Sequence, residues 1–511
     1  MSGYPRPRNL PSVPLPQVAA LLGAPVPPPI EVTGITHASG EVRPGDCYAG
    51  LPGARYHGAQ FAEAARAAGA VALLTDAAGA TLAAGSGLPA IVVPDPRAAL
   101  GPAADRIYGE PTRRLRVIGI TGTAGKTSTA YLIAAGLRAA GERPGLVGTI
   151  ETRLGDLVIA SARTTPEATD LHALLAVALE HGIRTIVLEV SSHALVLGRV
   201  GGVRFAVGGF TNFGTDHLDF HADLDEYFEA KARLFDGRCA TEIVNLADPS
   251  GARLVRPGTQ TYTPPGGPDA DWYATDIILS GYTQRFTANG PGGIRVPAGV
   301  GLPGAHNVAN ALLAIASLTA VGVEPAVAGA AVATCPAATG RMERVDSPTG
   351  IIGIVDYAHK PDSIKDVLDA LRMMAGDGDA PLAAPPPGRR IICVLGAGGD
   401  RDRGKRSLMG AYAAGGADTV IVTDDNPRTE DPARIRADVL GAAASVVGVT
   451  TTEIPDRRSA IAHAVAIAVP GDVIALLGKG HEQGQEIAGV IHPFDDRVEL
   501  AQALATKEGR T

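Results

Sequence analysis

The segment VIGITGTAGKTSTA, residues 117–130, has the residue types and the spacing of a loop that binds phosphate groups. Its glycines let backbone N–H groups approach phosphate oxygens, and the helix expected after the loop directs its positive end toward them. Lys126 would reach the terminal phosphates, and the Thr127 hydroxyl would hold Mg²⁺. Ile120 stands where the longer phosphate-loop pattern requires glycine, so the match is to the shorter form T-G-T-x-G-K-T. An apolar strand before the loop and a helical pattern after it favour phosphate binding over a tight turn with a surface lysine.

A second group of candidate residues is rich in acidic side chains and histidines. Glu189 follows the apolar run of TIVLEV, residues 185–190. A charged residue at the carboxyl end of a buried parallel strand faces the crevice where such sheets bind ligands. For Glu189 alone, a solvated strand end is an equal alternative. The segment 211–235 favours a ligand site, because it gathers Asp216, His217, Asp219, His221 and Asp223.

These residue types suit Mg²⁺, which prefers oxygen ligands and keeps several positions for water or phosphate. Histidine is a minority ligand of this ion, so His217 either binds the metal or orients a carboxylate. Lys231 lies in the helical stretch after the acidic segment, and taken alone it is an ordinary surface lysine.

Apolar strand candidates alternate with helical stretches along most of the chain. This alternation predicts an α/β fold with parallel sheets covered by helices on both faces. Residues 262–300 have a weak alternating pattern and are expected to form a β-rich excursion. At about 150 residues per domain, a chain of 511 residues suggests about three domains. The expected domains are a small N-terminal α/β domain at 1–112, a central P-loop domain with a parallel sheet at 113–340, and a Rossmann-like C-terminal α/β domain at 341–511.

Composition excludes several classes of protein. Lys and Arg total 45 against 53 Asp and Glu, and the resulting net charge of −8 argues against binding to nucleic acid or to a membrane surface. The four cysteines lie far apart without a CxxC pair, so they indicate neither a disulfide framework nor a zinc site. With no apolar leader or membrane-spanning run, we expect a cytoplasmic protein without membrane insertion.

Taken together, several motifs resemble those of the Mur ligase family. They are TGTAGKT, LEVSSH, NFGTDHLDFH, EAKARLF, NVANALLAI, GRMERV and DYAHKPDS. The resemblance runs from about residue 31 to residue 500. It implies three domains that match the division above. It also implies a ligase that uses ATP and Mg²⁺ to form an amide through an acyl phosphate.

The C-terminal third narrows this expectation. The segments 396–406, 423–432 and 476–485 are similar to those of family members that add diaminopimelate to UDP-MurNAc-L-Ala-D-Glu in peptidoglycan precursor synthesis. The sequence DNPR at 425–428 resembles the form that selects meso-diaminopimelate rather than L-lysine. The positive charge of Arg428 agrees with this preference, because its guanidinium can pair bidentately with the second carboxylate of diaminopimelate and would repel the ammonium group of lysine.

The resemblance also implies a set of site residues. Those expected to bind ATP are Gly122, Thr123, Ala124, Gly125, Lys126, Thr127, Ser128, Asn307, Asn310, Arg341 and Asp356. Those at the Mg²⁺ positions are Thr127, Glu189, His217 and Lys231, the lysine as a carbamate, which is an anionic oxygen ligand. The expected catalytic residues are Lys126, Lys231, His217 and Glu189. Those expected to contact the UDP-muramoyl dipeptide are Ser39, Thr164, Thr165, Ser191 and Arg199. The expected diaminopimelate pocket comprises Arg401, Asp425, Asn426, Pro427, Arg428, Gly478 and Glu482.

Three places depart from the family pattern. Ala38-Ser39-Gly40 stands where the family has D-S-R, so an arginine is missing, and Leu197 stands where glutamine is frequent. Both concern contacts to the UDP substrate. Ala124 replaces the asparagine of the phosphate loop, where backbone amides carry the binding role.

Three alternatives remain at this point. An L-lysine-adding ligase is disfavoured by Arg428. Folylpolyglutamate synthetase is disfavoured by the DNPR segment and by the domain of about 110 residues before the phosphate loop. From a different class, a P-loop nucleotide-binding regulator is disfavoured by the candidates at Glu189, His217 and Lys231. The expected partners are small molecules, and a monomer is the expected state.

Overall fold

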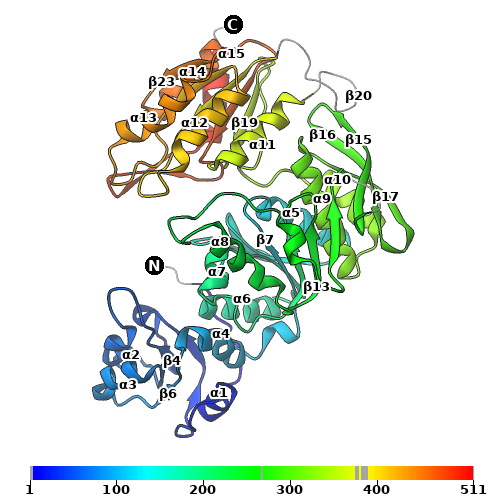
Figure 1. Cartoon of the computed structure of the whole chain (residues 1–511). Coiled ribbons are helices and arrows are strands. Elements are labelled where there is room, and N and C mark those ends of the chain that lie inside the picture. Colours follow the sequence, from blue (N-terminus) through cyan, green and yellow to red (C-terminus); the bar gives the residue numbers. More distant parts are fainter. Residues whose placement is uncertain (1–3, 266–268, 375–378, 381–388, 510–511) are drawn as a thin grey trace.

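The computed structural model describes residues 4–265, 269–374, 379–380 and 389–509. Three regions follow one another along the chain, each built on its own β-sheet with helices around it (Figure 1). The N-terminal region, in blue, lies at one end of the molecule and the C-terminal region, in yellow to red, at the other. The expected α/β fold class is therefore confirmed.

The N-terminal region carries a small parallel sheet. Its strands, in spatial order, are β3 (Gly34–Thr36), β4 (Asp46–Ala49), β5 (Ala72–Thr75) and β6 (Ala90–Val92). Its helices are α1 (Leu15–Leu21), α2 (Ala62–Ala67), α3 (Ala77–Leu82) and α4 (Pro96–Ile107). Asp95 caps α4, because its carboxylate accepts hydrogen bonds from the N–H groups of Arg97 and Ala98, both at 3.0 Å.

The central sheet is parallel in its middle and antiparallel at both edges. The parallel strands are β8 (Gly145–Val147), β11 (Thr185–Glu189), β7 (Arg116–Thr121), β12 (Phe205–Phe210), β13 (Cys239–Asn245) and β14 (Gln260–Thr263). The antiparallel additions are β9 (Glu151–Leu154) and β10 (Leu157–Ala160) at one edge, and β16 (Thr283–Gly290) and β17 (Ile294–Val300) after β15 (Trp272–Ser280) at the other. The predicted parallel sheet forms the middle, and hairpins extend it in antiparallel pairing at both edges. The predicted β-rich excursion at 262–300 is confirmed and joins this same sheet.

Strand β7 is apolar because helices cover both faces of the sheet. Ile118 and Ile120 pack into one buried cluster with α5 (Lys126–Ala139) and α9 (Ala305–Ala320), whereas Val117 packs into the cluster on the opposite face. The remaining helices of this region are α6 (Ala168–Glu180), α7 (Ser192–Val196), α8 (Leu224–Ala232) and α10 (Pro325–Thr334). Packing on both faces holds β7 in place, and it thereby positions the loop that follows this strand.

The C-terminal region has a second mostly parallel sheet. Its strands in spatial order are β18 (Glu343–Val345), β19 (Ile352–Asp356), β24 (Val473–Leu477), β21 (Ile391–Leu395), β22 (Thr419–Val422) and β23 (Thr450–Glu453), of which β18 is antiparallel. Its helices are α11 (Pro361–Arg372), α12 (Lys405–Gly416), α13 (Pro432–Ala443), α14 (Arg457–Ile467) and α15 (Asp496–Glu508). A hairpin of β25 (Gly484–Ile487) and β26 (Val490–Pro493) follows β24.

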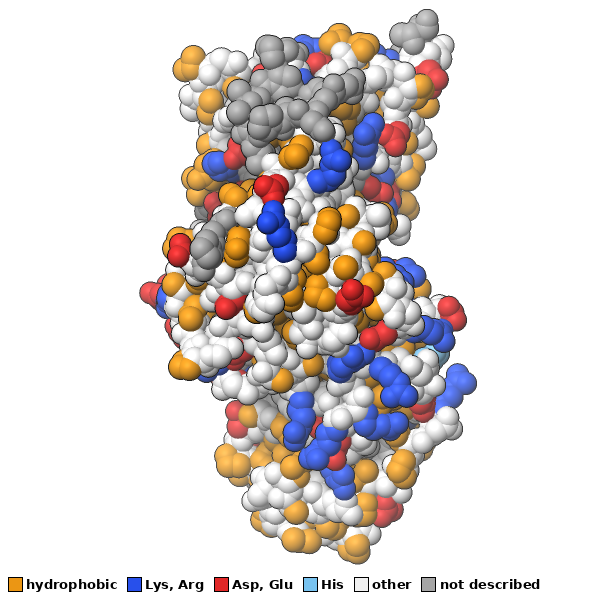
Figure 2. Space-filling view, turned by 90° about the vertical axis from the view of Figure 1, so that its right-hand side faces the viewer, with side chains coloured by type: hydrophobic (Ala, Val, Ile, Leu, Met, Phe, Trp, Pro, Cys, Tyr) orange, Lys and Arg blue, Asp and Glu red, His pale blue; other side chains and the backbone are white. Residues whose placement is uncertain are grey.

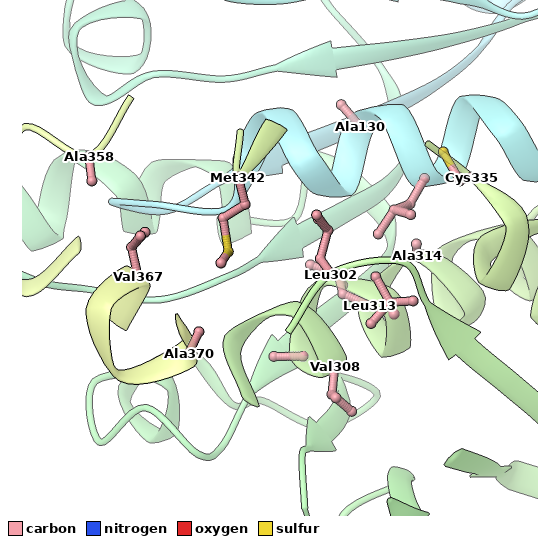
Figure 3. Packing of buried hydrophobic residues seen from close by; sticks show 14 of the residues in the cluster. Ala130, Leu302, Val308, Leu313, Ala314, Cys335, Met342, Ala358, Val367 and Ala370 are labelled. Atoms are coloured by element: carbon pink, nitrogen blue, oxygen red, sulfur yellow. The ribbon is translucent and has the colours of Figure 1, made fainter. Parts of the chain in front are cut away.

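The central and C-terminal regions share one apolar cluster. Val367 and Ala370 of α11 belong to the same buried cluster as Leu302 and Val308 of the central region, together with Met342 from the connection between them (Figure 3). Burial of this shared surface holds α11 against the start of α9. We propose domain boundaries near residues 112 and 340, where the chain passes from one sheet to the next.

Among the described residues, no helix has the length and apolar character needed to cross a bilayer. On the face shown in Figure 2, hydrophobic side chains lie among charged and neutral ones, and Lys and Arg side chains gather over its lower half.

A buried ion pair gives a stability prediction for the C-terminal region. Arg457 at the start of α14 donates two hydrogen bonds to the carboxylate of Asp496 at the start of α15, at 2.8 and 2.7 Å, and both side chains are fully buried. Arg457→Met leaves Asp496 charged without its partner. We expect this variant to lose about 3–5 kcal/mol of local unfolding free energy, measured by hydrogen exchange of the β24 amides.

The neighbouring residue supplies the control. Arg458 makes a similar bidentate pair with Glu499, but its own side chain is 65% exposed. We expect Arg458→Met to cost much less than Arg457→Met, because water screens this exposed pair. Equal losses for the two variants would contradict the claim that burial decides the effect.

Candidate active site

The phosphate loop lies at the carboxyl end of β7, and its two glycines are required by space as well as by backbone conformation. Gly122 has φ +144° and Gly125 has φ +83°. A Cβ at Gly122 would lie 1.9 Å from Thr211 Oγ1, and a Cβ at Gly125 would lie 2.5 Å from Asn310 Oδ1. Side chains at either position would displace the neighbouring strand end or α9.

Asn212 is a support of this loop that the sequence analysis missed. Its side-chain Oδ1 accepts a hydrogen bond from the Ala124 N–H at 2.9 Å, and its carbonyl accepts one from the Thr123 N–H at 2.9 Å. The loop conformation therefore depends on Asn212 rather than on a side chain at position 124.

Three lysine ammonium groups converge on the carbonyl groups of this loop. Lys126 Nζ donates to the Gly122 carbonyl at 2.7 Å, Lys231 Nζ donates to the same carbonyl at 3.0 Å, and Lys360 Nζ donates to the Thr123 carbonyl at 2.9 Å. Burial, with Lys360 nearby, lowers the pKa of Lys126 to about 8. Burial, then Lys126 and Lys360, lowers the pKa of Lys231 well below its ordinary value. Such a concentration of positive charge favours a polyanionic ligand.

Glu189, at the end of β11, faces the start of α5. Its carboxylate accepts hydrogen bonds from Thr127 Oγ1 at 2.9 Å, from Thr149 Oγ1 at 2.8 Å and from the Thr149 N–H at 2.9 Å. Glu189 is fully buried, so these donors compensate for its loss of water. Thr149 was missed because it follows a short strand with no local motif.

Asp216 is the acidic residue closest to the lysines. Its carboxylate lies 2.6 Å from Lys360 Nζ and 3.0 Å from His217 Nε2, and it is 4% exposed. Burial would raise the pKa of Asp216, but Lys360 and His217 lower it below its ordinary value. Burial lowers the pKa of His217 to about 2 and that of His359 to about 3, so both imidazoles are neutral at neutral pH.

These groups line a first cavity between the central and C-terminal regions. Most of the residues predicted to bind ATP lie on it, namely Thr123, Ala124, Gly125, Lys126, Thr127, Ser128, Asn307, Asn310, Arg341 and Asp356. Arg341 Nη2 also lies 3.4 Å from Thr127 Oγ1, and its guanidinium stacks over the Tyr357 ring at 4.5 Å. Asp356 accepts hydrogen bonds from the N–H groups of Met342 and Ala358, so it also shapes the wall.

A second cavity lies beside the first. Its C-terminal wall includes Arg401, Asp425, Asn426, Arg428, Gly478 and Glu482, which are six of the seven residues predicted for the amino-acid pocket. Its central wall includes His193, Asp216, His217 and Asp219. The two cavities share Asp216, His217, Tyr357 and His359. Ligands in the two cavities would therefore meet at these residues.

A buried lysine organises the second cavity. Lys479 is fully buried, and its Nζ donates to Asn426 Oδ1 at 3.0 Å and to Glu482 Oε2 at 3.1 Å, with Asp425 Oδ1 at 3.6 Å. Burial, with Asp425 nearby, raises the pKa of Glu482. Sequence analysis missed Lys479 because Asn426, one of its two hydrogen-bond acceptors, lies 53 residues earlier in the chain.

Arg428 does not stand free at the cavity wall. Its Nη1 donates to the Gly399 carbonyl at 2.7 Å, and its Nε lies 3.2 Å from Glu486 Oε2 on the β25 strand. Its φ is +53°, and a backbone hydrogen bond of 3.0 Å joins its N–H to the Glu486 carbonyl. The guanidinium is thus held in place by β25, and part of its charge is already paired.

Four of the residues predicted to contact the UDP substrate lie near Glu189. Thr164 Oγ1 lies 3.1 Å from Thr149 Oγ1, and Thr165 Oγ1 donates to the Glu189 carbonyl at 2.8 Å. Ser191 caps α7, and Arg199 pairs with Glu167 at 2.9 Å. Ser39 lies apart from these in the N-terminal region, in the short 3₁₀ turn Ser39–Glu41, and lines neither cavity.

The comparisons with known proteins agree with this geometry. Three family models cover successive parts of the chain: "Mur ligase family, catalytic domain" at 31–108, "Mur ligase middle domain" at 120–318 and "Mur ligase, glutamate ligase domain" at 340–480. The UDP-N-acetylmuramoyl-L-alanyl-D-glutamate–2,6-diaminopimelate ligase of Streptomyces coelicolor is 50% identical over 515 aligned positions, covering 99% of each chain. The chain belongs to the Mur ligase family.

Two further relatives support this. The ligase of the same name from Corynebacterium glutamicum is 46% identical over 473 aligned positions, covering 90% of this chain and 89% of its own. A solved structure of a ligase with that name aligns with a TM-score of 0.68 and 31% identity over 97% of this chain and 99% of that one. Members of the family are ATP-dependent ligases, so this Mur ligase is an enzyme of that class and not a nucleotide-binding regulator.

Removal of Lys479 tests how the second cavity is held together. In Lys479→Met, Asp425 and Glu482 face each other without a buried cation, and Asn426 loses a donor. We expect kcat/KM for the amino-acid substrate to fall by about 100-fold, the scale of a misplaced substrate group. Binding of ADP to the first cavity, measured by calorimetry, should stay within about threefold of the wild type. An unchanged kcat/KM would contradict this role of Lys479.

Proposed function

We propose that this Mur ligase joins meso-diaminopimelate to UDP-N-acetylmuramoyl-L-alanyl-D-glutamate, with conversion of ATP to ADP and phosphate. The names of its relatives support this reaction. The observation that carries it is the meeting of the two cavities at Asp216 and His217. An acyl phosphate made beside the phosphate loop is there within reach of an amine held in the second cavity. By the same proposal the enzyme acts in the cytoplasm as a monomer, on small molecules alone.

The residues of the first cavity fit the charge changes of the first step. The D-Glu side-chain carboxylate attacks the γ-phosphorus of ATP in line, and ADP leaves. Lys126 would exchange the loop carbonyls, to which it now donates, for phosphate oxygens, and the loop N–H groups with the N-terminus of α5 would face the remaining charge.

The second step takes place where the cavities meet. An amine of diaminopimelate attacks the acyl carbon, a tetrahedral intermediate forms, and phosphate leaves with the oxygen that the carboxylate contributed. Because the imidazole of His359 is neutral at the shared wall, it can accept a hydrogen bond from the incoming ammonium or amine. Most of the rate enhancement would come from holding three substrates in register.

Mg²⁺ fits the oxygen-rich end of the first cavity. Among the described residues, no cluster of three or more His, Cys, Asp or Glu side chains has the arrangement of a metal site. Mg²⁺ needs no such cluster, because phosphates and water supply most of its ligands. The Thr127 hydroxyl and the buried Glu189 carboxylate would hold the ion, with His217 and Lys231 as the further positions implied by the family. Bound there, Mg²⁺ would neutralise charge on the phosphates.

Lys231 is suited to carbamylation. Only a neutral amine reacts with CO₂, and this buried amine has a strongly lowered pKa. The reaction joins the Lys231 nitrogen to the carbon of CO₂ and releases one proton. It would place an anion beside Lys126 and Lys360, where it offsets part of their positive charge.

Carbamylation of Lys231 has a direct spectroscopic test. In ¹³C-bicarbonate, the wild type should show a carbamate carbonyl signal by NMR that disappears in Lys231→Met. Lys365 is a fitting control, because its side chain is 55% exposed and paired with Asp369, and Lys365→Met should keep the signal. A wild type without the signal at saturating bicarbonate would refute the carbamate.

The second carboxylate of meso-diaminopimelate is proposed to bind at Arg428. This carboxylate would take the N–H groups that Arg428 does not give to Gly399, in competition with Glu486. The side chain of L-lysine places an ammonium group there instead, which the guanidinium repels.

Substrate preference at Arg428 can be measured by phosphate release with UDP-N-acetylmuramoyl-L-alanyl-D-glutamate, ATP and Mg²⁺. We expect release with meso-diaminopimelate and little with L-lysine. Arg428→Met should lower kcat/KM for meso-diaminopimelate by about 100-fold, as expected for loss of a charge-assisted pair, and should raise lysine turnover, because the repulsion of the lysine ammonium group is removed. Faster turnover of lysine than of diaminopimelate by the wild type would overturn the assignment and favour the lysine-adding alternative.

The UDP-substrate side remains a proposal for the same reaction. Thr164, Thr165 and Ser191 lie next to Glu189, where the muramoyl peptide must end if its carboxylate is to reach the phosphate loop. Arg199 lies beside them, held by Glu167, and Ser39 would contact the uridine end.

A further inference from the structure

Lys360 crosses from one region of the molecule to another. It is the N-cap residue of α11 in the C-terminal region, yet its Nζ lies 2.6 Å from Asp216 Oδ2 and 2.9 Å from the Thr123 carbonyl oxygen in the central region. The two charged side chains are 11% and 4% exposed. An ion pair this sheltered is weakly screened by salt and has a defined geometry.

The pair lies where the two cavities meet. Asp216 belongs to the walls of both cavities, and so does His359, the residue directly before Lys360. Lys360 itself lines the first cavity. A shift of Lys360 relative to Asp216 would therefore move the amino-acid cavity relative to the phosphate loop.

The Gly214 backbone and the Asp362 side chain also come close here. A Cβ at Gly214 would lie 2.8 Å from Asp362 Oδ2 in the first turn of α11. The loop before Asp216 is thus in contact with the start of this helix, and the Lys360 pair closes the contact on its polar side.

A second contact between the regions is apolar. Val367 and Ala370 of α11 pack near Leu302, and a Cβ at Gly304 would lie 2.8 Å from the Ala370 Cβ. Apolar burial is non-directional, so it holds two surfaces together without fixing their relative position. A charge pair fixes that position. Lys360 therefore supplies a directional contact between the regions, and it is shorter than the one from Arg341 to Thr127 at 3.4 Å.

We propose that Lys360 is a positioning residue for ligation, which docks the C-terminal region on Asp216 and the Thr123 carbonyl and so aims the amino-acid cavity at the acyl group. This inference rests on the proposed function, because it assumes that the amine and the acyl phosphate meet at the shared wall. The charge of Lys360 is already paired with Asp216, so the proposed role differs from direct phosphate binding, which is assigned to Lys126 and the loop amides.

The test compares Lys360→Met with the wild type in steady-state ligation and in binding of ADP. We expect kcat/KM for the amino acid to fall by about 100-fold, the scale of a displacement of about 1 Å. The dissociation constant of ADP should stay within about threefold. Lys360→Arg keeps the charge and should recover a large part of the activity. Lys365→Met, on an exposed position of the same helix, should behave as the wild type.

A mutant cycle ties the effect to the partner. In an Asp216→Asn background, Lys360→Met should lower kcat/KM for the amino acid far less than it does in the wild type, because the negative charge that pairs with Lys360 is already gone. Three results would overturn the inference: wild-type kinetics in Lys360→Met; a large loss of ADP affinity with an unchanged KM for the amino acid; or equal losses in Lys360→Met and Lys360→Arg with a lowered unfolding temperature. A wild type that ligates no amine would instead refute the proposed function.

Discussion

The concentration of positive charge at the phosphate loop is the constraint on which the rest of the structure depends. Lys126, Lys231 and Lys360 place three ammonium groups on two neighbouring carbonyls, and burial makes their repulsion strong. Asp216 pairs with Lys360 where the central and C-terminal regions meet, and its negative charge offsets part of this positive charge. The site thus suits a polyphosphate, whose charge would compensate the lysines, and in the proposed function a carbamate at Lys231 would offset a further part.

The sheets explain how distant residues reach this place. The carboxyl ends of parallel strands meet at one edge of a sheet. At this edge the phosphate loop follows β7, Glu189 ends β11, and the loop with Asp216 follows β12. The second sheet presents the ends of β19, β21 and β24 toward the same cleft, with the amino-acid cavity among the loops that follow them. Two crevices of the same physical origin face each other, and an amide bond can form between their contents.

Local patterns in the sequence were enough to predict the α/β class, the phosphate loop, Glu189 and the acidic segment, because each depends on a strand, a turn and a helix that are contiguous. Six of the seven residues that the resemblance to the Mur ligase family implied for the amino-acid pocket line the second cavity. Neither the local patterns nor the resemblance could predict contacts between segments that are distant in the sequence. Lys479 matters only because the chain returns to Asn426, and Lys360 only because α11 docks on the central region. The pairing of Arg428 with Glu486 likewise depends on a hairpin that folds back over it.

The central claim is that a carboxylate is activated by phosphoryl transfer in the first cavity and captured by an amine from the second. The most direct measurement labels both oxygens of the D-Glu side-chain carboxylate with ¹⁸O and analyses the released phosphate by mass spectrometry. An acyl phosphate predicts one ¹⁸O in each phosphate formed during ligation, because the oxygen that attacks phosphorus leaves with it. Unlabelled phosphate accompanying full tripeptide formation would contradict the account.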